Sequence, residues 1–170
     1  MQGDAPSQAF SDTTKVVEIA PDEVRSIKVR FALDYWRNLR GAKRFPARAE
    51  IKPREIKGVL TNMVLIQVID AGRDFLFRVV GDHAGRGYNV QLTNRLLSDV
   101  SREIPRAAGH WRSIFGKVVA SGEASATRVS TGHDAPDANF TEAEAVFLPL
   151  GSAGHAVEHI ICVVEHVLKP

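Results

Sequence analysis

The stretch that decides the fold is residues 63–81, which read MVLIQVIDAGRDFLFRVVG. Two runs rich in Val, Ile, Leu and Phe flank a short polar segment with a glycine, a pattern typical of a β-hairpin. We therefore predict strands over 63–70 and 75–81. Both runs are apolar at successive positions, so each face of the resulting sheet needs a cover.

The segment upstream of this hairpin can supply one of the two covers. Its apolar residues recur at spacings of three and four, as on one face of a helix, and are Val24, Ile27, Phe31, Tyr35 and Leu39. Gly41 follows as a natural stop. We predict an amphipathic cap helix over 22–40 that covers the outer face of the sheet or mediates a dimer.

The rest of the chain completes an α+β pattern. Pro105 opens a helix that ends at Gly122, and three strands follow over 125–131, 141–150 and 156–167. Residues 1–20 hold few large apolar side chains, so we expect a flexible N-terminal arm. The 170 residues suit one domain, which we place at 21–170.

Charge is unevenly distributed although the net charge is only +2. Residues 24–54 hold ten Lys and Arg against two acids, a net charge of +8, so the remainder carries −6. A basic segment can bind nucleic acid or an anionic surface, or it can be a solvated helix face and loop. Zinc-finger spacings, leucine zippers and RNA-binding aromatic–glycine runs are all missing, which argues against nucleic acid as a partner.

Two further features bear on the compartment. No apolar run approaches the roughly 20 residues that a membrane span needs, and the first residues lack the pattern of a secretory signal. The single cysteine, Cys162, cannot form an internal disulfide, which fits a reducing compartment. We therefore expect a cytoplasmic protein without a membrane span.

Three segments carry a resemblance to a known family. They read LDYWRNLRG (33–41), RFPARAEIKPREIKGVLTNMVLIQVID (44–70) and DFLFRVVGDHAGRGYNVQLTNRLL (74–97). Together they resemble the PAS domain, and more narrowly a bacterial PAS-like family of small standalone proteins. Two glycines that end helical turns in the family are replaced here by Asn89 and Asn94. Asn is the next best residue for a left-handed backbone, so we expect the turns to be kept.

The resemblance implies a PAS-like five-stranded antiparallel sheet with helices on one face and a cavity between them. It also implies a sensory or scaffolding role in bacterial signalling, with no catalytic output of its own. The expected partners are a second copy of the chain, a protein signalling partner, or both, together with a small anionic or aromatic ligand. The sequence identifies no cofactor and no metal site.

Arg78 stands alone among apolar neighbours in FLFRVV. Strict alternation places it with Leu76 and Val80 on one sheet face, which by analogy with PAS domains looks toward the cavity. A buried guanidinium needs an anionic or carbonyl partner. Arg78 is therefore either the anchor of an anionic ligand or part of a structural ion pair, with Asp82 or Asp99 as candidate acids.

The remaining candidate ligand-binding residues are aromatic. Five of them can line a cavity or belong to the ordinary core, and they are Tyr88, Trp111, Phe115, Phe77 and Phe147. The hydroxyl of Tyr88 can in addition orient a ligand. His83 joins the set because haem-binding PAS domains use a histidine on a cavity helix.

A rival interpretation is a small α+β cavity enzyme of the isomerase or dehydratase type. It requires an acid–base pair inside the cavity, for which His83 with Asp99 and His110 with Asp82 are candidates. A second rival is a nucleic-acid-associated protein that uses the basic residues of 25–54.

Overall fold

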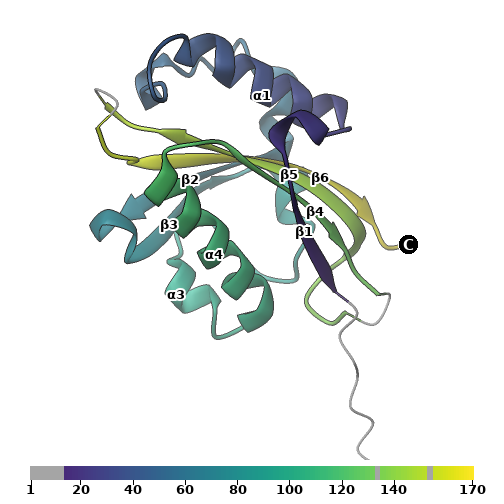
Figure 1. Cartoon of the computed structure of the whole chain (residues 1–170). Helices are drawn as coiled ribbons and strands as arrows, with labels where there is room; N and C mark the ends of the chain where they lie inside the picture. The colour runs from purple at the N-terminus through teal and green to yellow at the C-terminus, as the bar shows by residue number, and fades with distance from the viewer. Residues whose placement is uncertain (1–13, 133–134, 153–154) are drawn as a thin grey trace, which may run out of the picture.

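The computed structural model describes residues 14–132, 135–152 and 155–170 (Figure 1). These residues form a single antiparallel sheet with strand order β1-β4-β5-β6-β2-β3. The strands are β1 (Lys15–Ile19), β2 (Met63–Ile69), β3 (Asp74–Val80), β4 (Ser125–Ser130), β5 (Phe140–Leu150) and β6 (His159–Leu168). The predicted α+β class and PAS-like sheet are confirmed, with six strands instead of five.

The additional strand is β1, in a segment for which the sequence predicted a flexible arm. Lys15–Ile19 pairs antiparallel with β4, from Lys15 opposite Ser130 to Ile19 opposite Ala126. A five-residue strand with one buried side chain depends on its partner's backbone, and that pairing is not visible in local composition. The prediction of a flexible arm was wrong over Lys15–Ile19, and residues 1–13 of that predicted arm lie outside the described part of the chain.

The cap helix is shorter than predicted. Pro21–Glu23 forms a separate 3₁₀ turn, η1, and the α-helix α1 spans Ile27–Arg40. Ser26 caps α1 by accepting a hydrogen bond from the Val29 N–H at 3.2 Å. Gly41 ends α1 with a φ of +53°, which favours glycine.

α1 covers the outer face of the sheet over β5 and β6, as Figure 1 shows. Trp36 is 2% exposed, and its indole N–H donates to the Pro149 carbonyl at 2.8 Å. The start of α1 is anchored by Glu144 of β5, whose carboxylate accepts from the Arg25 and Ser26 N–H groups at 2.7 and 2.8 Å. Arg128 of β4 donates to the same carboxylate at 3.0 Å.

The opposite face of the sheet carries the short helices α2 (Asp82–Gly85) and α3 (Leu97–Val100) and the long helix α4 (Pro105–Ser121). Pro105 opens α4, and Gly122 ends it in the left-handed conformation, as predicted. Phe115 of α4 meets Phe75 of β3 edge-to-face, with ring centroids 5.2 Å apart. The remaining 3₁₀ turns are η2 (Arg48–Glu50), η3 (Lys57–Asn62) and η4 (Asp70–Gly72).

The predicted hairpin is confirmed, and it contains an irregularity at Arg78. β2 and β3 change register between Leu65 opposite Val79 and Ile66 opposite Phe77, so Arg78 is the extra residue of a β-bulge. Alternation holds from Phe75 to Arg78 and changes only beyond the bulge. Phe77 points toward α4 and is 2% exposed, whereas Arg78 is exposed to solvent. The prediction that Arg78 is buried toward the cavity was wrong.

The two asparagines that replace family glycines behave differently. Asn94 has a φ of +61°, so the left-handed turn is kept there as predicted. Asn89 does not adopt a positive φ. Its side-chain oxygen instead accepts a hydrogen bond from the Asn139 amide at 2.7 Å, which ties this segment to the β4–β5 connection.

Candidate ligand-binding cavity

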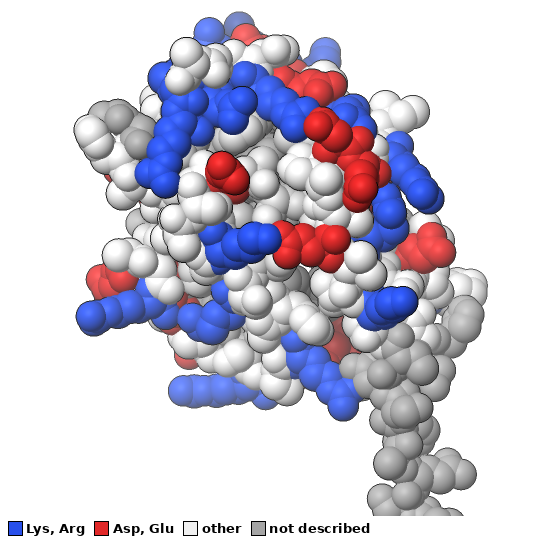
Figure 2. All heavy atoms as spheres, in the orientation of Figure 1, with Lys and Arg blue, Asp and Glu red and all other residues white. Residues whose placement is uncertain are grey.

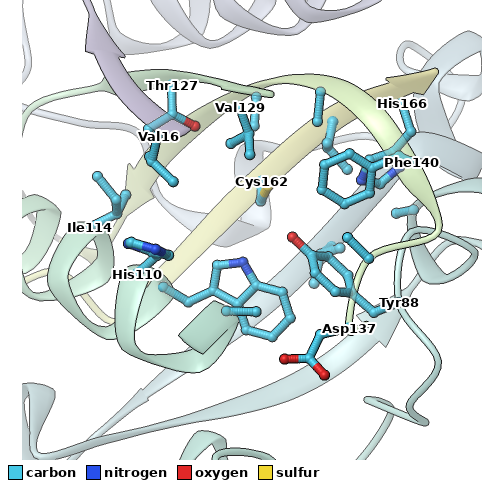
Figure 3. A pocket seen from close by; sticks show the side chains of 18 of the residues that line it. Val16, Tyr88, His110, Ile114, Thr127, Val129, Asp137, Phe140, Cys162 and His166 are labelled. Carbon is cyan, nitrogen blue, oxygen red and sulfur yellow. The ribbon is translucent and has the colours of Figure 1, made fainter. Parts of the chain in front are cut away.

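A cavity of about 120 Å³ lies between the sheet and α4 (Figure 3). Its wall includes inward-facing side chains of all six strands, one side of α4 and the segment around Tyr88. Most of the lining residues are apolar. The cavity reaches the surface where its lining includes the exposed residues Arg106 and His110 of α4 and Pro136 of the β4–β5 connection.

The five aromatic residues singled out from the sequence all line this cavity. Phe77 lies edge-to-face against Trp111, with ring centroids 5.7 Å apart, and Phe115 lies 6.0 Å from Phe147. Tyr88 meets Trp111 at 4.8 Å with an interplanar angle of 84°. The aromatic set therefore forms one connected wall, and its role in binding a ligand stays a prediction.

The other two predicted site residues do not line the cavity. Arg78 projects from the bulge in β3 on the opposite side of the strand from Phe77. His83 of α2 is half-buried behind the cavity wall, with its ring 6.4 Å from that of His166. Arg78 can therefore not anchor a ligand inside this cavity, and His83 is not part of its wall.

Sequence reasoning missed two contributors to the polar part of the wall, His166 of β6 and Asp137 of the β4–β5 connection. His166 is 8% exposed and stacks on Phe140, with ring centroids 4.7 Å apart (Figure 3). The signal available was one histidine in the apolar strand IICVVEHV, at an even spacing from Cys162. That spacing places both side chains on the cavity face.

Three titratable groups of the cavity wall, those of Cys162, Tyr88 and His166, are held in their neutral forms, and the wall also includes Arg106 and Asp137. Burial raises the pKa of the Cys162 thiol to about 12, and burial also raises the pKa of the Tyr88 hydroxyl. Burial, with a smaller contribution from nearby His83, lowers the pKa of His166 to about 4. Near pH 7 these three side chains therefore offer hydrogen-bonding groups without charge.

The position of His166 is fixed by its neighbours. Gly87 lies so close that a Cβ atom there would approach the His166 ring to 2.5 Å. The Asn139 N–H donates to the Gly87 carbonyl at 2.9 Å, which holds this segment against the β4–β5 connection. Only a glycine fits between the Tyr88 segment and the imidazole.

Comparison with known families supports the same architecture. The family model described as the PAS domain matches residues 24–164. The chain belongs to the PAS domain family. No curated protein and no solved structure matches this PAS domain significantly.

The acid–base pairs required by the enzyme interpretation are not assembled in the cavity of this PAS domain. Of His83, Asp99, His110 and Asp82, only His110 contributes to the wall. His110 is exposed at the cavity mouth.

Among the described residues, no helix is long and apolar enough to cross a bilayer.

Proposed function

We propose that this PAS domain is a sensory module of bacterial signalling whose cavity binds a small, uncharged and largely apolar ligand. The observation that carries the proposal is the cavity itself, which is bounded by an aromatic wall and by titratable groups held neutral. Its output runs through association with another protein, and we propose no catalytic step. The lone thiol of Cys162 supports a reducing, cytoplasmic location.

Size and charge favour one of the two ligand classes expected from the sequence. An engineered apolar cavity of about 150 Å³ binds benzene, so about 120 Å³ suits a compact ring compound. An anion would need a cationic group to replace its lost hydration. Arg78, the cation expected for that role, lies outside the cavity, and Arg106, which is part of its wall, is exposed at the mouth and not in the apolar interior. The aromatic alternative is therefore favoured over the anionic one.

Native mass spectrometry of freshly purified protein tests the ligand. We expect a small molecule on the wild-type chain and its loss from Ala145→Leu, because Ala145 lines the cavity and leucine fills part of it. Val79→Ser, on the exposed side of β3, is the matched control and keeps the ligand. A ligand retained by Ala145→Leu, or wild-type protein that carries none and binds no added toluene or phenol, contradicts the proposal.

For the output we propose association with a second copy through the outer face of α1. Ile27 and Phe31 are 86% and 44% exposed there, four residues apart on one helical face. Figure 2 shows Lys and Arg side chains gathered on this side of the molecule, with acidic side chains beside them. Among the cations of α1, Arg30 and Arg37 are already paired with Asp22, which limits repulsion between two copies.

Charge complementarity also favours a second copy. Asp34 is exposed on the same helix face, and among the described residues it makes no ion pair. In an antiparallel pair of α1 helices centred on Phe31, Asp34 of one copy comes opposite Lys28 of the other, whose amine would have to leave Asn62 Oδ1 of its own chain, 3.3 Å away, to reach it. A two-fold arrangement makes this contact twice.

Sedimentation velocity over a concentration series tests the association. We expect a dimer that Ile27→Glu converts to a monomer, whereas Val79→Ser leaves it intact. A wild-type chain that stays monomeric throughout, or a dimer that survives Ile27→Glu, contradicts this part of the proposal.

A further inference from the structure

We propose that the ligand of this cavity carries a hydrogen-bond acceptor that binds the hydroxyl of Tyr88. The inference rests on the proposed ligand-binding function and narrows the ligand to a chemical class. That class is a compact neutral ring compound with a carbonyl, nitrile or ether group or with a ring nitrogen. The Tyr88 hydroxyl would select such compounds over hydrocarbons of the same size.

The first support is a donor without an acceptor. No side chain or carbonyl of the described residues accepts a hydrogen bond from the Tyr88 hydroxyl. The indole of Trp111, whose ring centroid lies 4.8 Å from that of Tyr88, carries only a donor, so it can bond to the Tyr88 oxygen but cannot accept its proton. Asp137, a carboxylate in this part of the wall, points away from the hydroxyl in Figure 3.

The second support is that a ligand can reach the hydroxyl. Tyr88 is part of the cavity wall, and Figure 3 shows its hydroxyl pointing from the wall into the cavity. Among the described residues, the polar side-chain atoms that are both sealed from solvent and unpartnered belong to Arg40, His159 and His166, and the Tyr88 oxygen is not one of them. This oxygen therefore keeps accessible surface on the cavity side.

The other tyrosine of the chain, Tyr35 of α1, provides a contrast. Its hydroxyl donates to the Glu55 carboxylate at 2.7 Å and accepts from the Lys52 N–H at 3.1 Å. Both hydrogen-bonding roles of the Tyr35 hydroxyl are therefore filled by the chain itself. The donor role of the Tyr88 hydroxyl is left for a molecule in the cavity.

The third support is that the donor is held in place. The Tyr88 ring meets Trp111 and Phe140 edge-to-face, and the Tyr88 backbone forms an antiparallel bridge with Ala138. Burial raises the pKa of the Tyr88 hydroxyl, so the hydroxyl keeps its proton near neutral pH. Such preorganisation lowers the entropy that binding must overcome.

The geometry also favours a neutral acceptor over other ligand classes. A molecule that fills the cavity separates the Tyr88 hydroxyl from water, so the acceptor has to come from that molecule. A hydrocarbon would fill the volume but leave the hydroxyl unpaired. A carboxylate would accept the hydrogen bond, but it would lose its hydration in an apolar interior, since Arg106 is exposed at the mouth.

The test uses benzonitrile and phenylacetylene, which have nearly the same shape, but only benzonitrile ends in a strong acceptor. Calorimetric titrations measure both affinities for the wild-type chain, for Tyr88→Phe and for Tyr35→Phe. The ratio of the two affinities cancels the difference in hydrophobicity when variants are compared. We expect the ratio of benzonitrile to phenylacetylene affinity to fall by about 3- to 10-fold in Tyr88→Phe, the equivalent of one hydrogen bond.

Tyr35→Phe is the matched control, because it removes the same hydroxyl group outside the cavity. We expect it to leave the affinity ratio unchanged. A spectroscopic readout on the unmodified chain guards against a variant that fails to fold. A hydrogen bond to the nitrile nitrogen raises the frequency of the nitrile stretch, so benzonitrile bound to the wild-type chain should absorb above its position in an aprotic solvent.

The outcomes separate the two proposals. If the wild-type chain binds neither probe and no toluene, the proposed ligand-binding function fails and this inference fails with it. Three results overturn only the inference: toluene binds but neither probe does, the affinity ratio is the same in wild type and Tyr88→Phe, or the nitrile stretch of bound benzonitrile stays at its aprotic position. An equal fall of the ratio in Tyr35→Phe would likewise show that the cavity hydroxyl is not the cause.

Discussion

Both faces of the central sheet are apolar and covered by helices, but they differ in how closely the covering helix packs. On the α1 face, Trp36, Val29 and Leu33 are at most 2% exposed, and the space left between helix and sheet is about 10 Å³. On the α4 face the space is about 120 Å³. The first face has the close packing of a structural core, whereas the second is held open by aromatic side chains that meet edge-to-face.

This difference shows that hydrophobicity alone does not distinguish a close-packed core from a face that encloses a cavity. Both faces are apolar, and both are covered by helices. They differ in the fit of the cover, because α1 lies against both β5 and β6, whereas α4 approaches β5 and leaves the aromatic-lined cavity beside it. Substitutions on the two faces should therefore have different consequences.

The largest expected effect is on the free energy of unfolding, and it appears when the two tryptophans of the chain are each replaced by alanine. Trp36→Ala should lower the free energy of unfolding by about 3–5 kcal/mol, because it removes a fully buried ring and its hydrogen bond to Pro149. Trp111→Ala should cost less than half as much, since Trp111 is half-buried beside existing space. Urea denaturation measures both, and equal losses would show that the two faces are packed alike.

The next effect compares two small-to-large substitutions. Ala32→Leu on α1 should destabilise the chain by about 1–3 kcal/mol, because the neighbouring space cannot hold the added atoms. Ala145→Leu on the cavity face should leave stability nearly unchanged while it blocks phenol and toluene. Thermal denaturation and calorimetry distinguish the two. A strongly destabilised Ala145→Leu would mean that the cavity is smaller in solution.

A third prediction concerns pH. The pKa of His166 falls from an ordinary 6.5 to about 4 on folding, so between these values the unfolded chain binds a proton that the folded chain excludes. Stability should therefore decrease as the pH falls from about 6.5 toward about 4, with a slope near 1.4 kcal/mol per pH unit from this residue.

Comparing pH profiles with variants isolates that contribution. His166→Asn should flatten the decline, whereas His110→Asn, which removes an exposed histidine at the cavity mouth, should not. Denaturation midpoints at several pH values provide the measurement. Parallel profiles for wild type and His166→Asn would mean that His166 is protonated in the folded state.

The smallest expected effect lies on the outer surface of α1. Ile27→Ala should change the stability of the monomer by no more than about 0.5 kcal/mol, because Ile27 is 86% exposed. Val29→Ala, two residues along and fully buried, should cost more than 1 kcal/mol. Chemical denaturation at low protein concentration separates these effects from any dimer. A large loss at Ile27 would show that it contacts the body of the protein.

Much of the fold could be predicted because its elements carry local signals. The β2–β3 hairpin combines apolar runs with a turn, and α4 lies between Pro105 and Gly122. β1 could not be predicted, since KVVEI becomes a strand only through pairing with β4, more than a hundred residues later. α1 begins at Ile27, later than predicted, because Ser26 caps the helix and Pro21–Glu23 forms a separate 3₁₀ turn.

The candidate site was predictable in its apolar part only. Aromatic residues at helical and strand spacings indicated the wall, whose five members the structure brings together. Arg78 was misplaced because the analogy assigned the wrong face of β3 to the cavity: alternation itself puts Arg78 on the opposite side of the strand from Phe77, which lines the cavity. His166 was passed over because a single histidine in a strand does not reveal that one nitrogen will lack a partner.

The position of Glu144 has a practical consequence. Ala143 and Ala145, its neighbours along β5, face the cavity, whereas Glu144 itself holds the backbone at the start of α1. Side chains that alternate along one strand thus line the cavity on one face of the sheet and anchor the start of α1 on the other. A substitution at 143 or 145 that redesigns the cavity can therefore also disturb the anchoring of α1 by Glu144. Hydrogen exchange at the Arg25 and Ser26 amides would report whether the redesigned strand still holds the start of the helix.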